Sequence, residues 1–122
     1  MNTTELNAQL TNAIGAHGAW KLRLRMAAQK PGGDDMTETA GDHHNCEFGR
    51  WLDSLSVATK SMPEARDTIA LHAAFHQIAA RTAQLVKQGK KDAALAMLDA
   101  EFNEASNKLK NAVVKWKHAA NQ

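Results

Sequence analysis

Residues 63–88 read PEARDTIALHAAFHQIAARTAQLVKQ, and this stretch decides the fold. Pro63 suits the first turn of a helix, and Gly89, which follows Gln88, suits a left-handed helix end. Between them, apolar residues and two histidines recur at helical spacing along one face: Ile69, His72, His76, Ala79 and Leu85 or Val86. The stretch therefore predicts an amphipathic helix from Pro63 to Gln88 with both histidines on its buried side.

The same spacing predicts two further long helices. The first runs from Thr4 to Lys30, ends at Pro31-Gly32-Gly33 and carries His17 on its apolar face. The last runs from Lys91 to Ala119 and carries apolar residues at the spacing of a helix bundle: Leu95, Leu98, Phe102, Leu109, Val113 and Trp116. Because prolines and β-branched runs are few, no sheet is expected.

Between the first two long helices, a short helix from His44 to Leu55 is predicted to carry Cys46. Asp42 lies near its start and is a candidate cap. Residues 32–41 are polar and contain glycine, which indicates an exposed connector. The sequence thus predicts an all-α fold, an antiparallel four-helix bundle with one short helix carrying the cysteine.

Length and composition limit the classes of protein to which the chain can belong. With 122 residues, it fits a single domain over residues 1–122. Its 15 basic and 13 acidic residues are spread along the sequence, which gives nucleic-acid binding little support. One cysteine excludes an intramolecular disulfide, so a reducing cytoplasm is expected. No apolar run approaches the roughly 18 residues of a membrane helix, so no membrane contact is expected.

Histidine spacing indicates a metal site. On a helix, His72 and His76 lie on one face with Cβ atoms about 5 to 6 Å apart. Burying these rings together with His17 is unfavourable unless their nitrogens find partners, and a shared cation would satisfy one nitrogen on each ring. Cys46, near a helix start and near Arg50, is expected to favour the thiolate that binds metal. The alternative is ordinary packing of hydrogen-bonded core histidines and a small buried cysteine.

The candidate ligands suit one metal ion in particular. Three imidazoles and one thiolate suit tetrahedral Zn²⁺, with copper(I) as the main rival. His43, His44 and His118 are expected to be solvated, although His44 could replace a primary ligand in some state. Four protein ligands leave no open water position, and the sequence lacks His-Glu-x-x-His, so no enzymatic activity is expected. The predicted zinc ligands are His17, Cys46, His72 and His76.

Three motifs occur in order along the chain: His17-Gly18-Ala19-Trp20, Cys46-Glu47-Phe48-Gly49-Arg50-Trp51 and His72-Ala73-Ala74-Phe75-His76. In residue types and order they closely resemble the chemoreceptor zinc-binding domain family, over most of the chain except the last helix. The resemblance implies that the four candidate ligands bind zinc within a helical bundle. It also implies that Phe48 and Trp51 pack the cysteine segment, that Gly49 permits a close backbone approach, and that Trp20 anchors the core.

The family resemblance also implies a function. Similar domains are cytoplasmic bacterial regulatory modules, often dimeric and commonly fused to chemoreceptor signalling regions or diguanylate cyclase domains. We therefore expect a sensory domain that binds one zinc and responds to zinc availability or to oxidation of Cys46, a redox switch, by hypochlorous acid. Its output would be chemotaxis or cyclic-di-GMP synthesis through a domain in cis or in trans, with a homodimer as the expected assembly. The alternative is a purely structural zinc site in a helical protein-interaction module.

Overall fold

The computed structural model describes residues 2–30 and 35–122, which are largely helical. The elements are, in chain order, α1 (Thr3–Gln29), α2 (Thr37–Gly41), α3 (Glu47–Ser54), α4 (Val57–Lys60), α5 (Pro63–Lys87), α6 (Lys91–Met97), the π-helical turn η1 (Leu98–Phe102) and α7 (Asn103–Ala120). No strand occurs in the described residues, and the predicted all-α class is confirmed.

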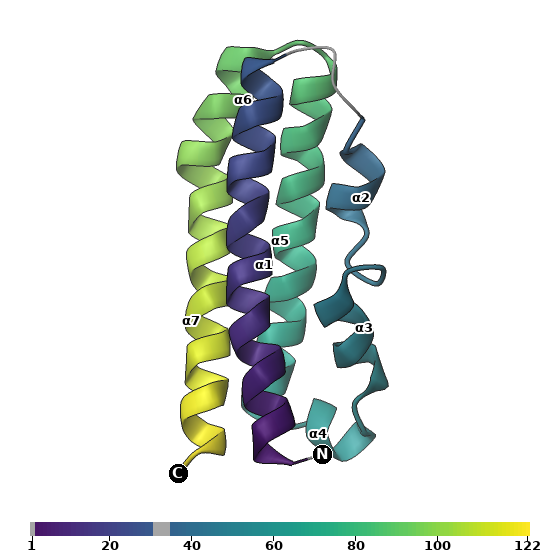
Figure 1. Cartoon of the computed structure of the whole chain (residues 1–122), viewed down its shortest axis with the longest axis vertical. Coiled ribbons are helices and arrows are strands. Elements are labelled where there is room, and N and C mark those ends of the chain that lie inside the picture. Colours follow the sequence, from purple (N-terminus) through teal and green to yellow (C-terminus); the bar gives the residue numbers. More distant parts are fainter. Residues whose placement is uncertain (1, 31–34) are drawn as a thin grey trace.

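Figure 1 shows three long rods, formed by α1, by α5 and by α6, η1 and α7 together. The short helices α2, α3 and α4 follow one another along the side of these rods and fill the fourth position. The chain runs up α1, down through α2 to α4, up α5 and down α6 to α7. The fold is therefore the predicted antiparallel bundle, with the cysteine segment as a broken fourth rod.

Local signals set the ends of the long helices. α1 begins at Thr3, and the side chain of the preceding residue, Asn2, caps it by accepting a hydrogen bond from the Glu5 N–H at 2.7 Å. It ends at Gln29, and the predicted stop at Pro31-Gly32-Gly33 lies outside the described residues. α5 has Pro63 in its first turn.

The end of α5 uses the expected glycine. Gly89 has a φ of 75°, in the left-handed region. Its N–H donates to the Val86 carbonyl at 3.0 Å. The Lys90 N–H donates to the Leu85 carbonyl at 2.9 Å. This Schellman arrangement satisfies the last carbonyls of the helix and turns the chain into α6.

The predicted exposed connector over residues 32–41 is wrong for its described part. Thr37–Gly41 forms α2, and Ala40 within it is fully buried. A Cβ atom added to Gly41 would lie only 2.9 Å from the Ala80 Cβ atom, so α2 lies directly on α5. The two small residues, Gly41 and Ala80, permit this contact. Composition alone indicated a loop for the segment that contains Gly41.

The short helix also begins later than predicted. α3 starts at Glu47 rather than at His44, so Cys46 is its N-cap residue.

The predicted last helix also differs from the prediction, because the π-helical turn η1 widens it between α6 and α7. Ala94, Leu98 and Phe102 are all buried and lie four residues apart. In a regular α-helix, residues four apart are displaced from one another by about 40° around the helix axis. The wider turn compensates for this displacement and keeps all three side chains facing the core.

The three long rods bury an apolar core along their length, which is interrupted near the middle by histidines. Among the described helices, none is long and apolar enough to cross a membrane.

Candidate metal centre

Four side chains from three parts of the chain meet in the interior of the bundle. His17 projects from α1, and His72 and His76 project from successive turns of α5. Cys46 comes from the residue before α3. Their ligand atoms, one from each residue, all lie within 4.8 Å of one another. The structure thus brings together all four residues that the sequence singled out.

The separations of the His17 Nε2 atom from the other three ligand atoms match a tetrahedral site. The Nε2 atom of His17 lies 3.0 Å from Nε2 of His72 and 3.3 Å from Nε2 of His76. It lies 3.6 Å from the Sγ atom of Cys46. Zinc–nitrogen and zinc–sulfur bonds of ordinary length, arranged tetrahedrally, place two nitrogens about 3.3 Å apart and a nitrogen and a sulfur about 3.6 Å apart. The separations from His17 therefore have the dimensions of a zinc site, and the other ligand atoms lie close enough to share one ion.

Backbone carbonyls fix the ring proton of two histidines. Nδ1 of His17 donates to the Ala13 carbonyl, and Nδ1 of His76 donates to the Ala40 carbonyl, each at 2.7 Å. Because a neutral imidazole carries one ring proton, Nε2 of each ring then bears a lone pair. Two lone pairs that face each other at 3.3 Å repel one another unless a cation lies between them. The hydrogen bonding itself therefore fits a bound metal ion.

Burial keeps the three imidazoles neutral. The exposed fractions are 4% for His17 and 1% each for His72 and His76. Desolvation lowers the pKa of His17 to about 4 and the pKa of His72 to about 2, and neighbouring histidines add to both effects. Desolvation also lowers the pKa of His76. At neutral pH all three rings are in the form that binds metal.

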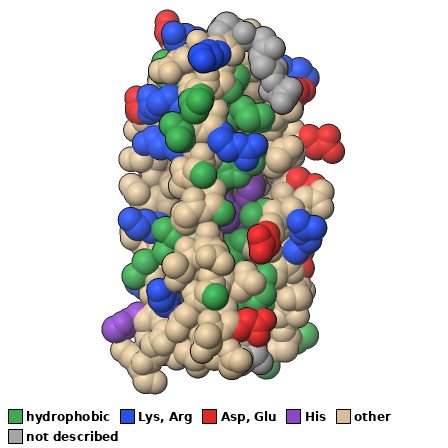
Figure 2. All heavy atoms as spheres, viewed as in Figure 1, with side chains coloured by type: hydrophobic (Ala, Val, Ile, Leu, Met, Phe, Trp, Pro, Cys, Tyr) green, Lys and Arg blue, Asp and Glu red, His purple; other side chains and the backbone are tan. Residues whose placement is uncertain are grey.

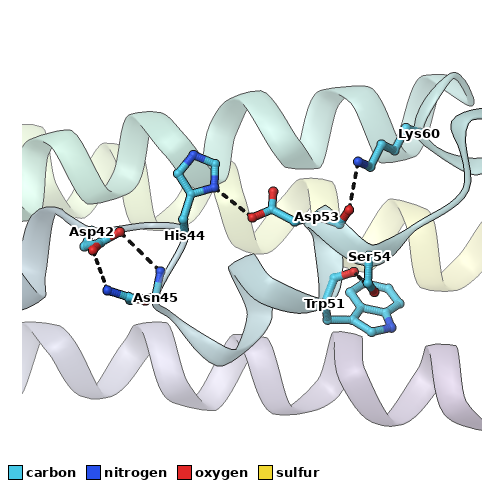
Figure 3. A network of polar contacts seen from close by, with 7 residues as sticks. All are labelled: Asp42, His44, Asn45, Trp51, Asp53, Ser54 and Lys60. Carbon is cyan, nitrogen blue, oxygen red and sulfur yellow. Dashed lines mark hydrogen bonds and ion pairs between the residues drawn. The ribbon is translucent and has the colours of Figure 1, made fainter.

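The cysteine has different surroundings from the histidines. Cys46 is half-buried and has an extended backbone at the start of α3. The prediction that Asp42 caps this helix is wrong, because α3 begins too far along the chain. Instead, the Asp42 carboxylate accepts hydrogen bonds from the Asn45 N–H at 3.2 Å and from the Asn45 side-chain amide at 2.6 Å (Figure 3). Asp42 thereby shapes the turn that leads into Cys46.

Further polar contacts join distant parts of the cysteine segment (Figure 3). Nδ1 of His44 contacts the Asp53 carboxylate at 2.8 Å, and Nζ of Lys60 donates to the Asp53 carbonyl at 2.9 Å. These groups are exposed, and such surface pairs contribute about 0 to 1 kcal/mol each. Packing therefore has to contribute most of the stability of this segment.

Gly49 provides the closest approach between backbone and site. A Cβ atom added there would lie 2.8 Å from the His43 carbonyl carbon and 3.2 Å from Cε1 of His72. The carbonyl oxygen of His43 would be closer still. The close backbone approach implied for Gly49 is confirmed, because any side chain would collide with the His43 backbone and press on the His72 ring.

Aromatic side chains enclose the cluster and connect it to α7. Phe48 is buried, and its ring meets the ring of His72 edge-on with centroids 5.2 Å apart. Trp51 stacks on Phe48 at 5.6 Å and contacts Trp116 of α7 at the same centroid distance. Trp20 of α1 is buried. The packing roles implied for these aromatic residues are confirmed.

The remaining histidines lie outside the cluster. His44 and His118 are exposed, as predicted. His43 is half-buried, with its ring centroid 6.1 Å from that of His72, so full solvation of His43 is wrong. Sequence reasoning also missed the Ala40 carbonyl that orients His76, since a backbone acceptor in an unpredicted helix leaves no signal in the side-chain pattern.

Three histidines and one cysteine enclosed by a helical bundle define a zinc-binding helical domain. A family model described as the chemoreceptor zinc-binding domain matches residues 17–83, more than half of the chain, and this span contains all four candidate ligands. The chain belongs to the chemoreceptor zinc-binding domain family, which is a sensory family and not a catalytic one. No match was found among curated proteins or among solved structures.

Proposed function

We propose that the domain binds one zinc ion through His17, Cys46, His72 and His76, and that loss of the cysteine ligand reports zinc shortage or oxidant. The origin of the four ligands carries this proposal. The histidines project from the long helices α1 and α5, whereas Cys46 belongs to the segment of short helices. Losing one bond would therefore release a segment and leave the core of long helices in place.

Bound zinc would supply a cross-link between α1, α5 and the cysteine segment, and its binding free energy would stabilise the docked segment. The redox step takes place at the thiolate. Cys46 takes chlorine from hypochlorous acid and releases hydroxide, and water then displaces chloride to leave a sulfenic acid. A sulfenic acid is a weaker metal ligand than a thiolate, so Cys46 leaves the site.

The contacts of the segment suggest how its release reaches the rest of the bundle. Trp51 lies between Phe48, which covers the cluster, and Trp116 of α7. Undocking α3 removes this aromatic contact from α7 and changes the surface that the bundle presents. We infer that this change controls a chemoreceptor signalling region or a diguanylate cyclase domain in the cytoplasm, in cis or in trans, with a homodimer as the signalling unit. Family membership supports this output.

Zinc content measured by native mass spectrometry tests the ligand assignment. The wild type is expected to hold one zinc per chain, and Cys46→Ser, His17→Ala and His76→Ala are expected to lose it. His118→Ala is the matched control, because His118 is exposed on α7, and it should keep its zinc. A different ratio in the wild type, or full retention in the three ligand variants, would overturn the assignment.

Treatment with oxidant tests the proposed redox response of Cys46. One equivalent of hypochlorous acid is expected to release zinc, to form sulfenic acid at Cys46 and to raise amide hydrogen exchange in residues 37–60 while α1 and α5 stay protected. Retained zinc with an unreactive Cys46 would contradict the redox proposal and favour a purely structural site.

A further inference from the structure

Two pockets reach the ligand cluster from different sides of α1. One has a volume of about 340 Å³ and lies between α1, at Ala16 and Trp20, and the residues around α2. We call it the α1–α2 pocket. The other, the α1–α7 pocket, has a volume of about 230 Å³. Figure 2 shows histidine atoms visible from outside near the middle of the face on which α1 lies beside α2 and α3.

The two pockets expose different ligands. Cys46 and His76 both line the α1–α2 pocket, and Cys46 is the least buried of the four. The α1–α7 pocket reaches His17 alone among the four. Ala13 also lines that pocket, and its carbonyl already accepts the Nδ1 proton of His17.

The charges around the pockets differ as well. Glu38, Asp42 and Glu47 line the α1–α2 pocket, and Arg23, whose guanidinium lies 4.0 Å above the Trp20 ring, is its cationic residue. Carboxylates therefore outnumber cations around its opening. The charged residue that lines the α1–α7 pocket is Lys110. The local potential favours approach of a cation through the first pocket and opposes it through the second.

We propose that the α1–α2 pocket is the route by which zinc reaches and leaves the cluster, and that the carboxylates around it draw the cation in. This inference rests on the proposed zinc-binding function and adds its exchange route. It also makes Cys46 the ligand that a reagent from solvent meets first.

Two exposed positions that flank His17 allow a matched test. Ala16 lines the α1–α2 pocket, and Gly18 lines the α1–α7 pocket. Ala16→Trp is expected to slow transfer of zinc to a chromogenic chelator at least tenfold with little change in zinc affinity, since entry and exit are slowed together. Gly18→Trp should stay within about twofold of the wild type.

The outcomes separate the route from the function. If both variants hold one zinc per chain but Ala16→Trp exchanges as fast as the wild type, or Gly18→Trp is slowed as much, the route is wrong and the zinc site stands. If neither the variants nor the wild type holds zinc, the proposed function has failed.

Thiol labelling of the zinc-loaded protein, in which the cysteine segment stays docked, tests the charge effect with a probe other than zinc. Cys46 should react faster with a trimethylammonium methanethiosulfonate than with the sulfonate analogue, by about tenfold at low salt relative to the same ratio for the unfolded chain. Glu38→Gln with Glu47→Gln should lower this ratio severalfold. Glu101→Gln with Glu104→Gln removes the same charge from η1 and α7 and should not change it. If both double variants changed this ratio equally, the proposed attraction by the carboxylates around the α1–α2 pocket would be wrong.

Discussion

Replacing Gly49 with alanine tests whether its close packing, against the backbone of His43 before Cys46 and against His72 of α5, sets the zinc affinity. The added Cβ atom would lie 2.8 Å from the His43 carbonyl carbon and 3.2 Å from Cε1 of His72. Both neighbours are constrained, one by the backbone and the other by a buried ring. The clash with the His43 backbone lies within the segment that carries Cys46, and the contact with His72 lies between this segment and α5. Relieving both displaces the turn that places Cys46 in the site, so the cost should appear in zinc binding.

The size of the effect follows from the packing. Inserting one methyl group into a tight site costs roughly 1 to 3 kcal/mol, and the rigid neighbours of Gly49 place this case at about 3 kcal/mol. Alanine returns up to about 1 kcal/mol through its better helix propensity. The remaining cost of about 2 kcal/mol corresponds to a zinc affinity weaker by roughly 30-fold.

Competition with a chromogenic chelator would measure the zinc dissociation constant of Gly49→Ala, and urea unfolding would measure its stability. Gly15→Ala is the matched control, because Gly15 lies within α1 and a Cβ atom added there meets nothing within 4 Å. The control should gain about 1 kcal/mol in stability and bind zinc as the wild type does. Wild-type zinc affinity in Gly49→Ala would refute the packing argument.

Two further predictions concern stability. The zinc-free protein should lose about 2 kcal/mol of unfolding free energy between pH 7.5 and pH 5 through His17 alone. The folded-state pKa of His17, about 4, lies below the ordinary value of 6.5, so stability is complete above pH 6.5 and is lost as the unfolded chain takes up protons. Urea unfolding across this range would check it, and a flat profile would contradict it. Gly89→Ala should lower the free energy of unfolding by about 1 kcal/mol with unchanged zinc content, because φ at Gly89 is 75° and alanine is strained there. Urea unfolding would measure this loss, and no loss would mean that alanine tolerates this turn.

The sequence was sufficient for those parts of the fold that rest on periodicity and local signals. α5 could be predicted because Pro63 and Gly89 mark its ends and His72 and His76 share the spacing of its apolar residues. The wide turn η1 could not, since it depends on how Ala94, Leu98 and Phe102 meet the neighbouring helices rather than on any local signal.

The candidate site divides in the same way. Its four side chains were predictable because His72 and His76 share one face of a helix, His17 lies on an apolar face, and the motifs around the four residues resemble a zinc-binding family. The orientation of His76 was not, because it depends on the Ala40 carbonyl in α2, a helix whose polar sequence resembles a loop. Asp42 was misassigned because a cap is defined by the first helical residue, and α3 begins at Glu47, directly after Cys46.

The wide spacing of the four ligands along the chain determines the order of folding and metal capture. His17 is 29 residues from Cys46 and 55 from His72, so an unfolded chain presents only His72 and His76 close together. Loops of this length close when α1 packs on α5, and the slow step is then formation of non-local helix contacts. We therefore expect metal uptake to follow folding, so that a folded molecule can gain and lose its metal without unfolding.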